Sequence, residues 1–190
     1  MANPVSARDI RRVIANATSL QVADRANIIM RVLAAMSACG VNQVLMMPEN
    51  GGICSLLKRG LQREQKLGDN RFPKLEMTDT PISGTVDDTF AATQAMVASG
   101  VKAIVVLGGD GTHRAVVKVC GQVPIAGIST GTNNAFPDPR EPTITGLAVG
   151  MVATGRIPEG IAFATNKLLR VEINDGERSD IALVDVVVST

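Results

Sequence analysis

The sequence contains no tryptophan and no tyrosine, only four phenylalanines and a single histidine. With so few aromatic rings, the chain has almost nothing to stack on nucleic-acid bases or to anchor at a bilayer interface. Its 19 Lys and Arg residues balance 18 Asp and Glu residues, so the chain also lacks the basic excess that is typical of nucleic-acid binders. We therefore expect no nucleic-acid partner.

Long hydrophobic runs are missing as well. The longest aliphatic runs have about five residues, far fewer than the roughly 20 that a membrane span needs. No basic start followed by an apolar stretch marks a secretion signal. Cys39, Cys54 and Cys120 are widely spaced and form no C-x-x-C pair, which favours buried thiols in a reducing compartment. We expect a cytoplasmic globular protein with no membrane partner and no cluster of metal ligands.

The sequence does contain an alternation of helical and strand-like patterns. Apolar spacing predicts helices over 8–15, 22–38, 53–62, 85–100 and 113–120, and another that opens at Glu141–Pro142. Short apolar runs predict strands over 41–47, 75–78, 103–107 and 124–128. This order indicates an α/β fold over residues 1–155, with ligands bound at the carboxyl ends of parallel strands.

The C-terminal part has a different pattern. Leu168–Ile173 and Ile181–Val188 are rich in β-branched residues and flank the turn Asn174–Glu177, which predicts a hairpin. We expect residues 156–190 to be the beginning of an all-β second domain, and an incomplete one.

Two polar turns follow the most apolar strands. The first, Gly108–Thr112, places three glycines around a carboxylate at a helix start, where backbone N–H groups and the helix dipole suit a phosphate. It is neither a Walker A loop nor the dinucleotide fingerprint, which needs a small residue at the place of Arg114. The second turn, Ser129–Asn134, carries hydroxyls and amides that suit phosphate, ribose or base. Two such turns on successive strands predict one nucleotide-binding crevice.

Two side chains of the first turn are candidates for chemistry. A carboxylate at Asp110, beside phosphates, needs Mg²⁺ or an acceptor hydroxyl to offset the repulsion, so we expect Asp110 to be catalytic. His113 either contacts phosphate as a cation or, as the helix start favours, faces solvent.

The residues Leu107–Thr112 and Gly131–Asn134 resemble the NAD kinase/diacylglycerol kinase-like superfamily. The pattern is most similar to the ATP-NAD/AcoX branch of that superfamily, which is associated with bacterial acetoin catabolism. Asn3–Pro4, Asp9–Arg12 and the stretch Val41–Ile53 carry the likeness to this branch, so that it covers nearly the whole chain.

This resemblance implies a three-layer, Rossmann-like parallel sheet followed by a β-rich domain, with the site in the cleft between them. It also implies ATP-dependent phosphoryl transfer to a hydroxyl of NAD or a related small molecule, with ATP and Mg²⁺ as cofactors. By the same resemblance, Asp110 binds the acceptor hydroxyl or the metal. The nucleotide contacts that it implies are Asn3, Gly108, Gly109, Gly111, Thr112, Thr130, Gly131, Thr132, Asn133 and Asn134.

The sequence departs from the family pattern in three places. The family's opening strand is missing before Asn3, and the β-rich part is short. Diacylglycerol kinases carry an Asp where this chain has Ala135, and NAD kinases carry Asn-Glu where it has Val184–Asp185. Asp185 either keeps a carboxylate for a ribose hydroxyl or is only a polar strand residue. Uncovered sheet edges predict self-association into a homo-oligomer.

The sequence therefore favours three functions, in decreasing order. The first is a kinase of the NAD kinase type, the second is a non-catalytic nucleotide-binding regulator, and the third is a lipid kinase of the diacylglycerol type.

Overall fold

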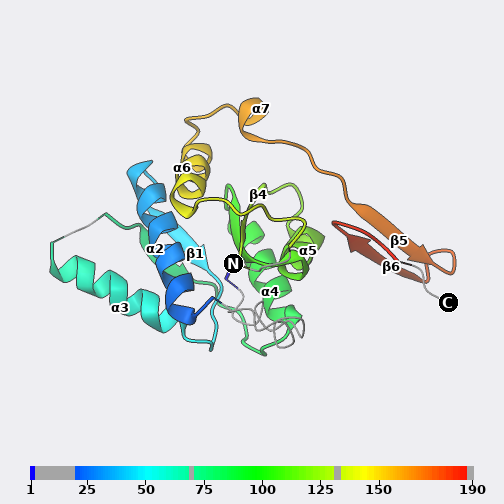
Figure 1. The fold of residues 1–190 in the computed structure, drawn as a ribbon, viewed down its shortest axis with the longest axis horizontal. Coiled ribbons are helices and arrows are strands. Elements are labelled where there is room, and N and C mark those ends of the chain that lie inside the picture. Colours follow the sequence, from blue (N-terminus) through cyan, green and yellow to red (C-terminus); the bar gives the residue numbers. More distant parts are fainter. Residues whose placement is uncertain (3–19, 69–70, 131–133, 188–190) are drawn as a thin grey trace.

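The computed structural model describes residues 1–2, 20–68, 71–130 and 134–187, in which helices and short strands alternate (Figure 1). The helices are α2 (Val22–Ala38), α3 (Ile53–Lys66), α4 (Val86–Ala98), α5 (Asp110–Val119), α6 (Pro142–Ala153) and α7 (Glu159–Ala162). The strands are β1 (Gln43–Met46), β2 (Lys74–Met77), β3 (Ile104–Gly108), β4 (Ile125–Ser129), β5 (Leu169–Ile173) and β6 (Arg178–Ala182). The predicted α/β class is confirmed, and the helix expected over 8–15 lies outside the described residues.

The first four strands pair in parallel, as predicted. Val44 of β1 lies opposite Leu75 of β2, and Val106 of β3 lies opposite Gly127 of β4. Within the described residues, these pairs form two two-stranded sheets. The start of the chain lies beside β3, because Ala2 forms a parallel bridge with Leu107. The carboxyl ends of β1 and β2 therefore point in the same direction, and so do those of β3 and β4.

Strand β3 is covered by helices on both faces. Successive side chains of a strand point to opposite sides. Ile104 and Val106 pack in one cluster, which includes Ala92 of α4 and Val116 of α5. Leu107 packs in the other cluster, with residues of α2, α3 and α6. Helices therefore cover both faces of β3, which explains why its sequence is apolar throughout.

Helices α2 and α6 pack closely side by side (Figure 1). Two glycines of α6 allow this approach. A Cβ at Gly146 would lie 2.7 Å from the carbonyl oxygen of Val32, and one at Gly150 would lie 2.8 Å from the Cβ of Cys39. Backbone packed this tightly leaves no room for a larger side chain.

The C-terminal strands form the predicted antiparallel hairpin, but the second strand was wrongly placed. Ile173 pairs with Arg178, and the ladder ends where Leu169 meets Ala182. Because β5 has only five residues, β6 has no partner beyond Ala182, and Val184–Val187 lie in no strand. The turn is tight, with positive φ at Asn174 and its two successors.

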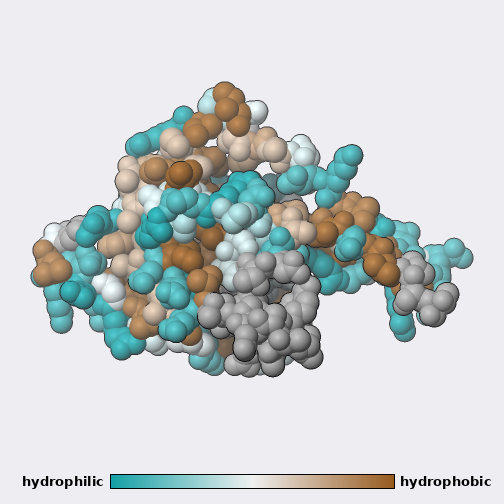
Figure 2. All heavy atoms as spheres, viewed as in Figure 1, coloured by the Kyte–Doolittle hydropathy of each residue, from teal (hydrophilic) through white to brown (hydrophobic). Residues whose placement is uncertain are grey.

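The hairpin lies at one end of the molecule, where Figure 2 shows hydrophobic surface. Leu169 and Ile173 are about half exposed, at 47% and 52%. That residues 156–190 begin a further domain stays a prediction. In the part of the chain that is described, no helix is long and apolar enough to cross a membrane.

The α2–α6 contact can be tested at Gly146. We expect Gly146→Ala to lower the free energy of unfolding by about 1–3 kcal/mol, because the added methyl overlaps the backbone of α2. Gly160→Ala is the matched control, since a Cβ there meets nothing within 4 Å. Urea unfolding measures both variants, and equal stabilities would contradict the close contact.

Candidate functional site

The glycine-rich turn is the first turn of helix α5. Strand β3 ends at Gly108, Gly109 caps the helix, and α5 begins at Asp110 rather than at residue 113 as predicted. The N–H groups of Thr112 and His113 donate to the carbonyl oxygen of Gly109, at 3.0 and 3.2 Å. The first N–H groups of a helix have no partner within it and form its positive end. This turn is therefore suited to bind an anion.

The glycines of this turn are needed for different reasons. None of Gly108, Gly109 and Gly111 has a positive φ, so backbone freedom explains none of them. A Cβ at Gly108 would lie 2.6 Å from the Cβ of Thr112, and one at Gly109 would lie 2.8 Å from Oδ1 of Asn134. A Cβ at Gly111 meets nothing within 4 Å. Gly108 and Gly109 thus allow packing, whereas Gly111 leaves open space.

That open space belongs to a cavity of about 810 Å³. Its walls are residues 47–51 after β1, residues 82–85 between β2 and α4 with the first turn of α4, and Gly109 with the first two turns of α5, including Gly111 and Arg114. All three walls follow the carboxyl ends of strands, where α/β folds bind ligands. The volume is within the range of about 300–1,000 Å³ that is typical of ligand pockets.

A smaller cavity, of about 370 Å³, lies between β1 and β3. Its lining is mainly apolar and includes Val44 and Val105, together with Met1. It contains none of the predicted site residues, so the larger cavity is the candidate site.

The wall between β2 and α4 is held by Asp88. Its carboxylate accepts hydrogen bonds from the hydroxyl and the N–H of Ser83, at 2.6 and 2.7 Å, and from the N–H of Gly84 at 2.8 Å. The hydroxyl of Ser83, followed by these N–H groups, lowers the pKa of Asp88. Thr85 caps α4 by accepting from the N–H of Asp87 at 3.2 Å. The loop is therefore ordered by its own side chains.

Neither this wall nor the wall after β1 was predicted as part of the site. Their sequences, Ser83-Gly84-Thr85 and Pro48-Glu49-Asn50-Gly51, follow predicted strands and contain turn residues. A systematic reading of every strand's carboxyl end would have found both, since in a parallel sheet these ends meet at one edge.

Asp110 connects the two predicted turns. Its Oδ2 accepts from the N–H of Ala135 at 3.0 Å, and its Oδ1 accepts from the N–H of Phe136 at 2.9 Å. The side chain of Asn134 donates to the hydroxyl of Ser129 at 2.9 Å in the same loop. The catalytic role of Asp110 stays a prediction, but its structural role is clear: it anchors the loop after β4.

The structure brings together only part of the predicted site. Gly131, Thr132, Asn133 and Asn3 lie outside the described residues. Gly109, Gly111 and Thr112 of the first turn line the cavity, whereas Gly108 and Asp110 do not, and neither do Ser129, Thr130 and Asn134 of the second turn. Asp185 is exposed and lies beyond β6, so its predicted place in a strand is wrong. Within the described residues, no three acidic, histidine or cysteine side chains form a metal-binding group.

His113 is fully buried, which corrects the prediction that it faces solvent. Its Nδ1 lies 2.9 Å from the carbonyl oxygen of Gly109, and its ring packs against Phe136 at a centroid distance of 5.7 Å. A Cβ at Gly127 would lie 2.6 Å from its Nε2. Burial lowers the pKa of His113. The neutral ring therefore supports the turn from within the core, and the absence of a side chain at Gly127 makes room for it.

Comparisons with known proteins point to one family. Residues 12–157 match the family described as the ATP-NAD kinase N-terminal domain. The whole chain is 59% identical, over 192 aligned positions, to Acetoin catabolism protein X of Cupriavidus necator. It covers 53% of that relative and so spans about half of its length. No solved structure matches the chain.

The different roles of the glycines give a first prediction for the site. Gly111→Ala should leave the fold intact, because its methyl enters open space, yet it should weaken ATP binding about tenfold or more by blocking the close approach of a phosphate. Gly108→Ala should instead lower the free energy of unfolding by about 1–3 kcal/mol, because its methyl overlaps Thr112. Thermal unfolding and calorimetric titration with ATP measure the two effects. An unchanged affinity in Gly111→Ala would contradict a phosphate site at this turn.

The burial of His113 gives a second prediction, on pH. Because its pKa is lowered from 6.5 in the folded protein, the unfolded chain binds the proton more readily. Its stabilising effect should be complete above pH 6.5 and be lost as the pH falls towards the folded pKa. His113→Asn, which keeps a donor near Gly109 but does not titrate, should show a smaller loss. Urea unfolding at pH 7.5 and 5.0 tests this, and identical pH dependence in both proteins would refute it.

Proposed function

Because the chain belongs to the family of the ATP-NAD kinase N-terminal domain, we propose that it binds a nucleotide at the start of α5 and takes part in phosphoryl transfer from ATP to NAD or a related hydroxyl compound. The observation that supports this most strongly is the position of Gly109 and Gly111 in the wall of the 810 Å³ cavity. The N-terminus of α5 there offers N–H groups and positive potential to a phosphate.

Catalysis of this kind depends on positioning and on charge neutralisation. Asp110 stands at the first position of α5, next to the proposed phosphate position, and its two oxygens each accept one backbone N–H. A carboxylate oxygen has further lone pairs, so Asp110 can also accept from an acceptor hydroxyl or contact Mg²⁺. Mg²⁺ is commonly held by one or two carboxylates and the substrate phosphates, and Asp110, which adjoins the cavity-lining residues Gly109 and Gly111, would be such a carboxylate. The metal would supply neutralisation of phosphate charge.

The three-layer arrangement around β3 is consistent with a Rossmann-like sheet, and we include that finer description in the proposal. The name of the relative further suggests a place in acetoin catabolism, although that name describes the relative.

A nucleotide-binding regulator is the second candidate. It is favoured by the contacts of Asp110, whose oxygens hold Ala135 and Phe136, and by the exposed position of Asp185 outside β6. Both observations account for these acidic residues without a catalytic role. A lipid kinase is the third, because Ala135 stands where those enzymes carry an Asp.

A transfer assay separates these candidates. The chain is incubated with Mg²⁺ and γ-labelled ATP, and with NAD or diacylglycerol in parallel. We expect label in NAD, and Asp110→Asn should lower that transfer by about 100-fold or more while ATP binding survives. Asp138→Asn is the control, because Asp138 is exposed and pairs only with nearby Arg140 among the described contacts.

Each other result selects a different function. ATP binding without transfer to either acceptor supports the regulator, and label in diacylglycerol supports the lipid kinase. If the chain binds no ATP at all, the nucleotide site itself is refuted.

A further inference from the structure

Arg114 lines the proposed nucleotide cavity. It lies three residues after Gly111 on α5, so the two positions are neighbours on one face of the helix. Among the described residues that line the cavity, it is the single Lys or Arg, whereas Glu49 and Asp88 are acidic. A nucleotide polyphosphate brings several negative charges into this wall. The helix N-terminus alone offsets only about half an elementary charge, so a cationic side chain would add to the neutralisation that a metal supplies.

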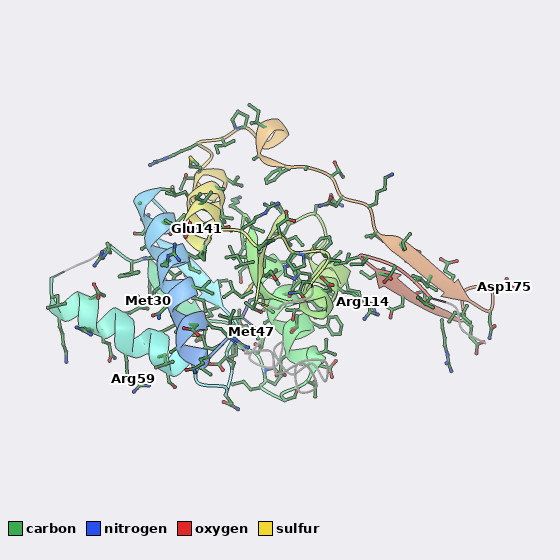
Figure 3. All side chains as sticks on the ribbon, viewed as in Figure 1. Met30, Met47, Arg59, Arg114, Glu141 and Asp175 are labelled. Atoms are coloured by element: carbon green, nitrogen blue, oxygen red, sulfur yellow. The ribbon has the colours of Figure 1, made fainter. Side chains whose placement is uncertain are left out.

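The guanidinium of Arg114 is held by the C-terminal hairpin. Its Nη2 forms an ion pair with Oδ2 of Asp180 on β6, and its Nε donates to the carbonyl oxygen of Ile181 at 2.6 Å. Figure 3 shows Arg114 between α5 and this strand. The link joins residues that are 66 positions apart in the sequence. A single side chain therefore belongs both to the cavity wall and to the contact that docks the hairpin.

Asp180 has a second cationic partner. Nζ of Lys118, one helical turn after Arg114, lies 2.8 Å from Oδ1 of Asp180. The hydrogen bond from Lys118 is the main reason why the pKa of Asp180 is lowered. Lys118 does not line the cavity. If Arg114 turned away, Asp180 would remain paired.

We propose that Arg114 binds the phosphates of the nucleotide and that Asp180 competes with them for its guanidinium, so that nucleotide binding loosens the docking of the hairpin. This inference rests on the proposed nucleotide site. It adds to that site a phosphate-binding residue, Arg114, and a coupling to the C-terminal hairpin. The reciprocal effect follows by linkage: a firmly docked hairpin lowers nucleotide affinity.

The exchange is energetically easy in this geometry. The side chains of Arg114 and Asp180 are 42% and 47% exposed, and ion pairs this exposed contribute little to stability. A phosphate carries more charge than a carboxylate and matches the planar fork of a guanidinium. Arg114 therefore gains by exchanging Asp180 for phosphate, while Lys118 keeps the carboxylate neutralised.

The test uses two variants that break the same ion pair from opposite sides. Arg114→Gln should weaken ATP binding about tenfold or more, because a charge-assisted phosphate contact is lost. Asp180→Asn should strengthen it about two- to fivefold, because the competing anion is gone. Lys118→Gln, the matched control on the same helix, should not strengthen ATP binding. Arg114→Lys should fall between wild type and Arg114→Gln, since it keeps the charge but loses the fork.

Isothermal titration of the full chain with ATP, and with adenosine as a probe without phosphate, measures these affinities. We expect adenosine binding to be the same in wild type and Arg114→Gln. Thermal unfolding checks that the two ion-pair variants have similar stability. If Arg114→Gln and Asp180→Asn change ATP affinity in the same direction, or if neither changes it, the competition is refuted while the nucleotide site stands. If wild type binds no ATP, the proposed function fails instead.

Discussion

The close packing at the beginning of α5 is the constraint on which the candidate site depends. Three places without a side chain make it possible: Gly108 lies against Thr112, Gly109 against Asn134, and Gly127 against the ring of His113. Because His113 and Thr112 enter the core there, the helix begins directly at the end of β3. Its positive end consequently faces the cavity at the carboxyl edge of the strands, where a phosphate is best stabilised.

Helix α5 also connects the parts of the molecule that surround this cavity. Asp110 holds the loop after β4 through two backbone N–H groups, and Arg114 and Lys118 hold the hairpin through Asp180. On the side of the helix away from Asp110, Arg114 and Lys118, the buried side chains of Thr112 and Val116 pack into the core. A ligand that alters the charge at the start of α5 therefore acts on groups that already link two other elements.

Much of the fold could be predicted because local patterns and tertiary packing agree. The helix over 22–38 and the strands after Val41 and Ala103 follow from apolar spacing alone, and their bounds differ little from the structure. The prediction failed where a distant partner decides. Strand β6 ends at Ala182 because β5 ends, which the β-branched sequence after Ala182 does not reveal. The place of His113 at a helix start favoured exposure to solvent, whereas its burial depends on distant residues, Gly127 of β4 and Phe136.

The sequence by itself determined the α/β order and the presence of a glycine-rich turn at a helix start, because both depend on residues that are neighbours in the chain. The tertiary structure alone decided which walls complete the cavity, that Asp110 holds the loop after β4, and that Arg114 faces both the cavity and Asp180. The contact between Arg114 and Asp180 joins residues 66 positions apart. No local pattern encodes such pairs, since they form only when separate helices and strands pack against one another.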